Sequence, residues 1–225
     1  MLTTLNNIAG LLKDKGDLDA AEPMFREVLN ARKKILGENH PEVATSMNNL
    51  ASLLQDKGVW NEAESLYRES FALRKKTLGP HHPEVAISLN NLGSLLRAKG
   101  DLVQAEMIIR QALIIWKSVL GKNPHIATSL IHLALLLTSR GKLMEAKKCF
   151  YEAVDIQRDV LGDNHPKVAD TLQWIADIEK IQGNRSVALD HAKERLAIVT
   201  QLFGPDHDET KEAQILVDSI QVDDE

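Results

Sequence analysis

The chain has 225 residues, of which 44% are hydrophobic, 26% are charged and only 4% are aromatic. This composition argues against a disordered chain and predicts a core built mainly from aliphatic side chains. The net charge of -5 gives no electrostatic case for nucleic acid or an anionic membrane as a partner, because both attract basic surfaces. No segment approaches 18 consecutive apolar residues, so we expect no membrane insertion, and the single Cys149 favours a reducing, cytoplasmic compartment.

Two segments of the chain are near copies of each other. LGENHPEVATSMNNLASLLQDKG begins at Leu36, LGPHHPEVAISLNNLGSLLRAKG begins at Leu78, and they match at 16 of 23 positions. A motif that returns at a fixed period of this size is typical of repeat proteins, in which each unit stacks on the next. Ten of the twelve glycines follow that period in two series, Gly16, Gly58, Gly100, Gly141, Gly183 and Gly37, Gly79, Gly121, Gly162, Gly204.

Each period contains two segments with apolar residues at helical spacing, which we call helix A and helix B. In the third period, helix A carries Leu89, Leu92 and Leu96, and helix B carries Ile109 and Trp116. The glycine between the helices suits the end of helix A, and a polar residue after it is predicted to cap helix B. These predicted caps are Asp17, Asp101 and Asn184.

The second break in each period ends helix B at a glycine and starts the next helix A at a proline, where the missing N–H costs no hydrogen bond. The prolines are Pro41, Pro83, Pro124 and Pro166. A histidine precedes three of them, and His207 holds the same place in the last copy. Because these histidines fall in different periods, we interpret His40, His82, His165 and His207 as parts of helix starts and not as a metal site.

The fold prediction is therefore an all-α solenoid of five antiparallel helical hairpins in a single array over residues 1–225. The hairpins are expected at about 1–37, 38–79, 80–121, 122–162 and 163–204, with a capping helix at 206–222. Pro23 lies inside the first helix B, where it removes a backbone hydrogen bond. The fifth hairpin has Glu179 where other copies have Leu and Ala192 where others have a large residue, so we expect it to pack less well.

Small residues recur in both helices of every hairpin, and they carry a resemblance to a known family. Helix A has Ala9, Ala51, Gly93, Ala134 and Ala176, and helix B has Ala21, Ala63, Ala105, Ala146 and Ala188, with a large residue four positions later in the first four copies. This pattern resembles the tetratricopeptide repeat, and the 42-residue period with HPEVA and LNNLA/G resembles its kinesin light chain subtype. The resemblance implies a right-handed superhelix that binds protein partners in a concave groove.

The face of helix A opposite the packed leucines provides the candidate site. The repeated asparagines offer both donors and an acceptor, which suits them to hold the backbone of an extended peptide, as groove asparagines of the family do. They could instead be solvated or brace the neighbouring repeat, and the apolar residues of the fourth and fifth hairpins could line a pocket or pack between repeats. The candidate residues are Asn7, Asn48, Asn49, Asn90, Asn91, Ser94, Arg97, Ile131, His132, Leu135 and Trp174.

The sequence contains no convergent set of unlike residues of the kind that catalysis needs, so we expect no catalytic residues, cofactor or metal. The predicted function is a non-catalytic scaffold or adaptor that binds a partner peptide or helix and acts as a monomer. Three alternatives stay open. They are a regulatory or sensor portion of a longer signalling protein, the same portion of a longer enzyme, and end-to-end stacking of copies, since the first hairpin lacks the HPEVA lead-in.

Overall fold

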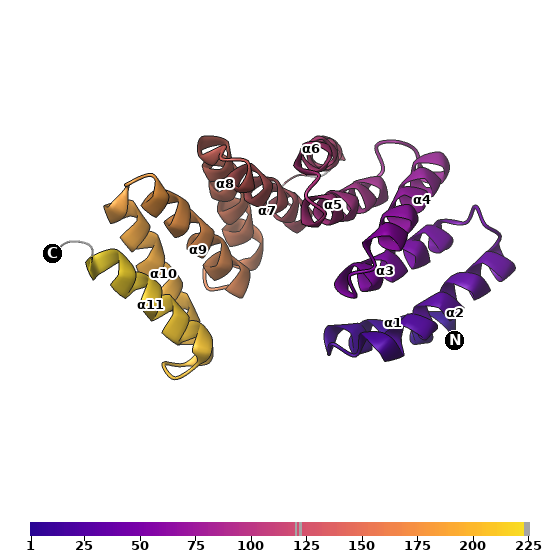
Figure 1. The fold of residues 1–225 in the computed structure, drawn as a ribbon, viewed down its shortest axis with the longest axis horizontal. Helices are drawn as coiled ribbons and strands as arrows, with labels where there is room; N and C mark the ends of the chain where they lie inside the picture. Colours follow the sequence, from indigo (N-terminus) through magenta and orange to yellow (C-terminus); the bar gives the residue numbers. More distant parts are fainter. Residues whose placement is uncertain (120, 122, 223–225) are drawn as a thin grey trace. The chain divides into compact units, whose positions relative to one another are not determined.

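The computed structural model describes residues 1–119, 121 and 123–222, and all its regular elements are α-helices (Figure 1). Helices of odd number from α1 to α9 are the predicted A helices, and those of even number are the predicted B helices. This confirms the all-α solenoid of helical hairpins. The helices are α1 Leu2–Asp14, α2 Leu18–Leu36, α3 Pro41–Asp56, α4 Trp60–Leu78, α5 Pro83–Ala98, α6 Leu102–Val119, α7 Pro124–Ser139, α8 Leu143–Leu161, α9 Pro166–Ile181, α10 Arg185–Phe203 and α11 Asp208–Val222.

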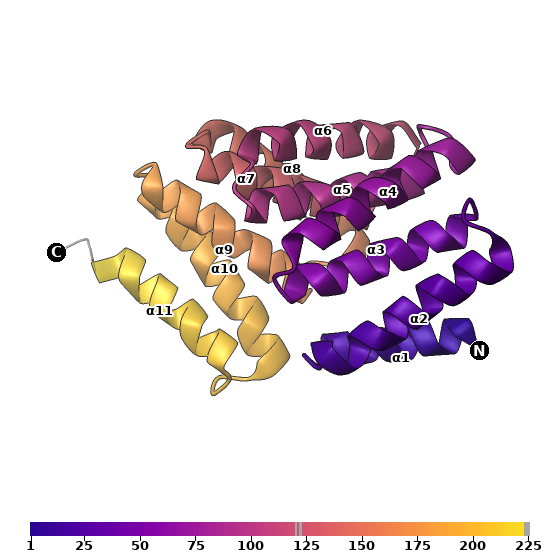
Figure 2. The ribbon, with the colours of Figure 1, turned by 45° about the vertical axis from the view of Figure 1, so that its right-hand side comes forward.

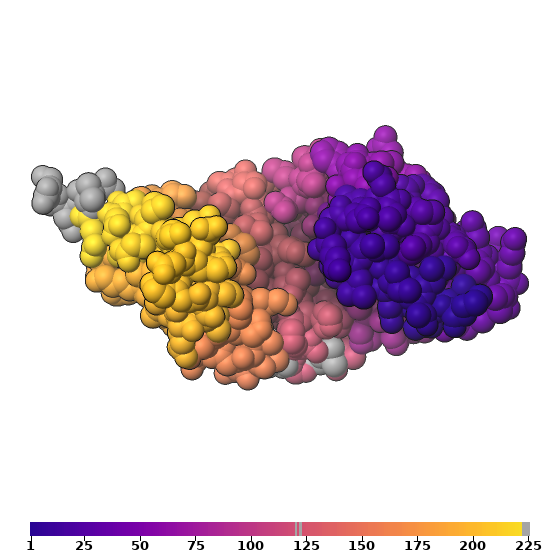
Figure 3. All heavy atoms as spheres, turned by 90° about the horizontal axis from the view of Figure 1, so that it is seen from below, coloured from indigo at the N-terminus to yellow at the C-terminus, as the bar shows by residue number. Residues whose placement is uncertain are grey.

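The chain divides into two compact units, Met1–Val119 and Leu120–Glu225, which we call unit 1 and unit 2. Unit 1 holds three hairpins, α1–α2, α3–α4 and α5–α6, which follow one another in chain order in Figure 2. Unit 2 holds the hairpins α7–α8 and α9–α10, followed by α11. In Figure 3 the atoms of α11 lie directly against those of α10, which is the helix that α11 packs on.

The helix ends follow the predicted punctuation, with one exception. Gly37 ends α2 with φ 84° and ψ 155°, a conformation that only glycine adopts without strain. Asp17 caps α2 by accepting a hydrogen bond from the Ala20 N–H at 3.2 Å, and Asp101 accepts from Gln104 at 3.1 Å. The prediction for Asn184 is wrong, because its side-chain amide donates to the Glu179 carboxylate at 2.7 Å instead of capping α10.

Histidine is the residue that caps most of the A helices. The Nδ1 atom of His82 accepts a hydrogen bond from the backbone N–H of Glu84 at 3.2 Å, and this bond satisfies one of the free donors at the start of α5. Asn123 does the same at the start of α7, where its Oδ1 accepts from His125 at 2.8 Å. The helix-start interpretation of the histidines is confirmed, and the others make the equivalent bond: His40 to Glu42, His165 to Lys167 and His207 to Glu209.

Small residues set the distance between the two helices of a hairpin. The alanines of both rows are buried, with 0% exposure at Ala21, Ala63 and Ala105. A Cβ atom added to Gly93 would lie 2.5 Å from Cγ1 of Ile109, so α5 and α6 approach too closely there even for alanine. α2 continues through Pro23, which lies on its exposed side.

Buried arginines join successive hairpins of unit 1. Arg32 in α2 is 6% exposed, and its Nη1 donates to Ser46 Oγ at 2.8 Å in α3. One repeat later Arg74 in α4 is 3% exposed and donates to Ser88 Oγ at 2.8 Å in α5. Each guanidinium also forms an ion pair at the start of the next A helix, Arg32 with Glu42 and Arg74 with Glu84.

Unit 2 is held by different polar contacts. Glu179 is 1% exposed, and its carboxylate accepts from Lys147 Nζ at 2.7 Å and from Tyr151 Oη at 3.0 Å. The Tyr151 hydroxyl also lies 2.9 Å from Nε2 of His191. Glu179 therefore joins α8, α9 and α10 through a polar cluster whose other members are half-buried, where the sequence suggested only poorer packing.

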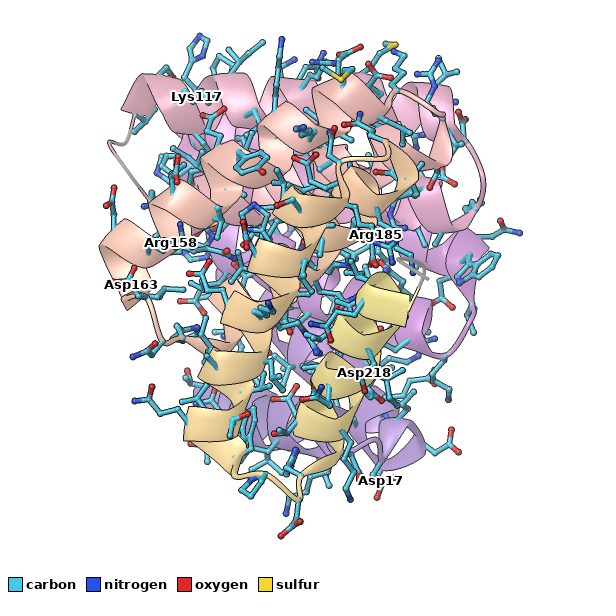
Figure 4. All side chains as sticks on the ribbon, turned by 90° about the vertical axis from the view of Figure 1, so that its left-hand side faces the viewer. Asp17, Lys117, Arg158, Asp163, Arg185 and Asp218 are labelled. Carbon is cyan, nitrogen blue, oxygen red and sulfur yellow. The ribbon has the colours of Figure 1, made fainter. Side chains whose placement is uncertain are left out.

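Alanines and the last helix complete unit 2. Ala176, Ala188 and Ala192 are all fully buried and pack with Val217 and Ile220 of α11. Arg185 at the start of α10 donates to the carbonyl oxygen of Ile220, near the end of α11, and both ends lie together in Figure 4. On another edge of unit 2, Arg158 pairs with Glu194 at 2.6 Å and lies 3.9 Å from Asp163 (Figure 4).

Candidate functional site: an asparagine-lined pocket on the A helices of unit 1

An open pocket of about 460 Å³ is lined mainly by residues of the first two A helices, α1 and α3. Phe25 of α2, which is 3% exposed, also contributes to the lining of this pocket. Two of the predicted site residues, Asn7 and Asn49, are brought together here. The pocket is lined by Asn6, Asn7, Gly10, Leu11, Lys13, Asp14, Phe25, Asn49 and Ser52.

The asparagines pair across the repeats. Nδ2 of Asn49 in α3 donates to Oδ1 of Asn6 in α1 at 2.9 Å, and Nδ2 of Asn91 in α5 donates to Oδ1 of Asn48 in α3 at 3.0 Å. Both bonds link one A helix to the next, so bracing of neighbouring repeats is part of what these residues do. Each donating amide keeps a second N–H and its carbonyl oxygen for other partners, because an amide has two donors and one acceptor group.

In the adjacent asparagines of α3 and α5, the first residue is more buried than helical geometry alone suggests. Asn48 and Asn90 are both 8% exposed, whereas Asn49 and Asn91 are half-buried. Asn7 is exposed and belongs to the pocket lining. Ser94 and Arg97 on α5 are half-buried, and they do not line the α1–α3 pocket.

Ion pairs fix the helix ends beside this face. Lys13 in the pocket lining pairs with Asp56 of α3 at 2.9 Å. Lys57 donates to Asp19 at 2.6 Å and to Glu22 at 2.7 Å, and its hydrogen bonds lower the pKa of both carboxyl groups. The charges around the pocket are therefore balanced, which suits an uncharged partner group such as a peptide backbone.

The remaining predicted site residues belong to unit 2. Ile131, His132 and Leu135 are half-buried on α7. Trp174 on α9 is half-buried and stacks on Phe150 of α8, with ring centroids 5.6 Å apart at 25°. Trp174 therefore takes part in the packing between the two hairpins of unit 2.

Sequence reasoning missed the arginine–serine contacts and the Glu179 cluster. The signal for the first was present, since an arginine is followed by a serine 14 residues later in two successive periods, at Arg32 and Ser46 and at Arg74 and Ser88. The second left no periodic signal, because Lys147, Tyr151 and His191 occur in single copies.

Among the described residues there is no group of three or more His, Cys, Asp or Glu side chains that could hold a metal ion. None of the described helices is long and apolar enough to cross a membrane.

The sequence profile of the tetratricopeptide repeat matches the chain four times in overlapping register, at residues 1–76, 47–118, 84–139 and 125–201. The chain belongs to the tetratricopeptide repeat family. Tetratricopeptide repeat (TPR) arrays are in general non-catalytic scaffolds for protein–protein interaction. No curated protein sequence matches the chain.

Solved structures with the same fold include kinesin light chain-like TPR proteins, and the repeats of this TPR protein are of that type. The nearly identical TPR-like repeats of a kinesin light chain from Podosopora anserina are 25% identical, with a TM-score of 0.73 over 90% of this chain and 96% of that one. BtubC (BKLC) from P. vanneervenii is 20% identical, with a TM-score of 0.77 over 89% and 80% of the two chains. MamA is 19% identical, with a TM-score of 0.58 over 90% and 94%.

Proposed function

We propose that this TPR protein is a cytoplasmic, monomeric adaptor that holds an extended segment of a partner protein along the A helices of unit 1. The observation that carries the proposal is the pocket of about 460 Å³, in which amides of successive repeats meet on one face. A row of amides with free hydrogen-bonding capacity can bind peptide groups whatever the side chains of the ligand.

The pairing of the asparagines supports this role. The bonds from Asn49 to Asn6 and from Asn91 to Asn48 fix the amide planes before any ligand arrives. A fixed donor or acceptor loses less conformational entropy on binding than a mobile side chain does. Bracing of the repeats and recognition of a peptide are therefore compatible roles for the same residues.

Gly10 offers a clean test of the proposal. It lines the pocket, no atom lies within 4 Å of the place where its Cβ would be, and its helical backbone accepts any side chain. Gly10→Arg should fill the pocket without loss of stability. Replacement of Asn49 or Asn91 is less suitable, because each also removes a bond between repeats worth about 1 kcal/mol.

The experiment begins with peptides selected from a displayed random library against the whole chain. Binding of these peptides is then measured to the wild type, to Gly10→Arg and to Ser65→Arg, a control on the exposed side of α4. We expect Gly10→Arg to weaken binding about tenfold or more while Ser65→Arg has no effect. Equal affinity of all three proteins for every selected peptide would contradict the proposal.

A further inference from the structure

Two crevices in unit 1 occupy equivalent places one repeat apart, between successive B helices. The first, of about 340 Å³, lies between α2 and α4 and includes Glu38, Glu69 and Ala72 in its lining. The second, of about 220 Å³, lies between α4 and α6. Since the backbone pattern is the same, the side chains alone distinguish the two. The second is lined by Phe71, Lys75, Pro80, His81, Val85, Leu89, Gln111, Ile114 and Ile115.

The change from the first crevice to the second removes negative charge and adds apolar surface. Glu38 is replaced by Pro80, Glu69 by Gln111 and Ala72 by Ile114, each 42 residues later. Ile114 is 66% exposed, whereas Val85 and Leu89 are buried and form the floor. The volume of about 220 Å³ is below that of pockets for drug-sized ligands, and it suits one large apolar side chain.

The apolar surface extends from the crevice along the outer face of α6. Val103 and Met107 are each 59% exposed and share that face with Ile114. In the preceding B helix the equivalent residues are Asn61, Ser65 and Ala72, which are polar or small. Offsets of four and seven residues place the three apolar side chains in one stripe about 16 Å long, which is the length of a docked helix of three turns.

Positive charge borders the crevice. Nζ of Lys75 lies 5.7 Å from the centre of the Phe71 ring, a cation–π contact that holds the ammonium at the rim. Lys75 lies in the basic last turn of α4 and has no ion pair with any residue that the structure describes. Lys76 of the same turn lines the first crevice instead, where its Nζ donates to Oδ1 of Asn39 at 3.1 Å. Among its described lining residues, the second crevice has Lys75 and His81 but no carboxylate.

We propose that the α4–α6 crevice and the stripe on α6 form a second docking surface, separate from the A-helix pocket, for an acidic amphipathic helix of a partner protein. One large apolar side chain of that helix fills the space between Phe71 and Ile114. A neighbouring carboxylate of that helix pairs with Lys75, and further apolar side chains cover Val103 and Met107. Exposed apolar patches rimmed by charge are typical of protein interaction sites.

The probe for this surface is a synthetic helix-forming peptide of about 15 residues with leucines on one face and glutamates on the others. A matched peptide carries lysine in place of every glutamate. Binding to the whole chain is measured by isothermal titration calorimetry at millimolar peptide. The test variant Val103→Asn, Met107→Ser, Ile114→Ala gives α6 the outer residues of α4, so the replacements suit the same place in a repeat.

We expect saturable binding of the acidic peptide, about tenfold or more weaker binding to the triple variant, and no change in melting temperature, because the three residues are exposed. Lys75→Glu should reverse the preference in favour of the basic peptide. Gly10→Arg should leave binding unchanged, which separates this surface from the proposed pocket on α1 and α3. In the crevice between α2 and α4, the double variant Glu69→Gln, Ala72→Ile introduces the residues of the second crevice. We expect this variant to bind the acidic peptide more tightly than the wild type does.

Several outcomes would overturn the proposal. These are no saturable binding of the acidic peptide, equal binding of the basic peptide, full binding by the triple variant, or loss of binding in Gly10→Arg. Sedimentation of the chain without peptide gives a further check. A dimer that forms with rising concentration and disappears in the triple variant would assign the surface to a second copy of this chain.

Discussion

Unit 1 and unit 2 build the same hairpins but connect them differently. In unit 1, Arg32 and Arg74 donate to serines of the next hairpin. At the equivalent place in unit 2, Gln157 accepts from Thr171 at 2.8 Å, and both side chains are buried. The difference teaches that a repeat tolerates several kinds of contact between hairpins, provided that the small residues and the helix ends keep the spacing.

The same contrast holds at the position of Glu179. Its equivalents Leu54 and Leu96 in unit 1 are buried apolar residues at 1% and 2% exposure. Glu179 is equally buried, and it keeps its charge. Burial by itself raises the pKa of Glu179, but hydrogen bonds from Lys147, Asn184 and Tyr151 outweigh this effect and lower the pKa. The copy in α7 of unit 2, Leu137, is also apolar and fully buried. The position is therefore an aliphatic core site in unit 1 and in α7, and an ionic one only in α9.

The largest expected effect comes from giving unit 1 the residue of unit 2. Leu96→Glu would bury a carboxylate without a lysine partner, and the residue equivalent to Lys147 is Glu64, a like charge. We expect a loss of at least about 4 kcal/mol in the free energy of unfolding, measured by urea denaturation. A loss below about 1 kcal/mol would mean that the two units do not differ in this respect.

The ion pair of unit 2 can be broken from one side or removed whole. Lys147→Met leaves the Glu179 carboxylate buried without its ammonium and should cost about 3 kcal/mol. Lys147→Met with Glu179→Leu should recover most of this loss, since an apolar pair of similar volume replaces the ions. Urea unfolding of the two variants measures the difference, and a double variant as unstable as the single one would argue against it.

Overpacking tests the close approach of α5 and α6 in unit 1. Ala105→Leu adds volume at a fully buried contact and should destabilise the chain by about 2 kcal/mol. Val103→Leu, on the exposed side of the same helix, is the matched control and should have little effect. Thermal unfolding of both variants gives the comparison, and equal melting temperatures would contradict the packing described for Ala105.

A smaller effect is expected at the helix starts, where histidine caps helices in both units and Asn123 caps α7 of unit 2. His82→Ala removes the acceptor for the Glu84 N–H and should cost about 1 kcal/mol. His82→Asn should restore most of it, because Asn123 already fills this role in unit 2. If His82→Asn is as unstable as His82→Ala, in thermal unfolding, the two caps are not equivalent.

The smallest expected effect is a pH dependence confined to unit 2. Burial lowers the pKa of His191 below 6.5, and the positive charge of Arg158 lowers it further. The negative charges of Glu194, Glu179 and Asp190 raise the pKa but do not outweigh burial. The unfolded chain then binds more protons, so unit 2 loses stability as the pH falls from 6.5 towards the folded-state pKa. Hydrogen exchange of α8 to α10 should show this in the wild type and less in His191→Gln. An identical pH dependence in both proteins would exclude His191 as its source.

Much of the fold could be predicted because its determinants are local. A glycine with positive φ, a histidine cap and a first-turn proline act within four residues, so the sequence shows them directly. The small residues of the hairpins also repeat, and repetition made their role visible. These features account for the correct prediction of an all-α solenoid of helical hairpins.

The contacts between hairpins were less predictable, because they join residues that lie far apart in the chain. Asparagine often caps helices, but the Asn184 side chain bonds to the Glu179 carboxylate instead. The burial of Glu179 is in turn explained by its ion pair with Lys147, 32 residues earlier. Helical geometry placed Asn48 and Asn90 on the flank of an exposed face, yet packing leaves each of them only 8% exposed. Which amides stay accessible thus depends on packing that periodicity does not describe.

Within each unit the helices pack chiefly on their neighbours in the chain, as α1 on α2 and α2 on α3. No distant segments have to meet before the first native contacts form, so little loop-closure entropy is lost on the way to the folded state. Folding can therefore begin in any hairpin and spread outward, at rates typical of proteins rich in local contacts. The same arrangement lets an end of the array open and close while its centre stays folded.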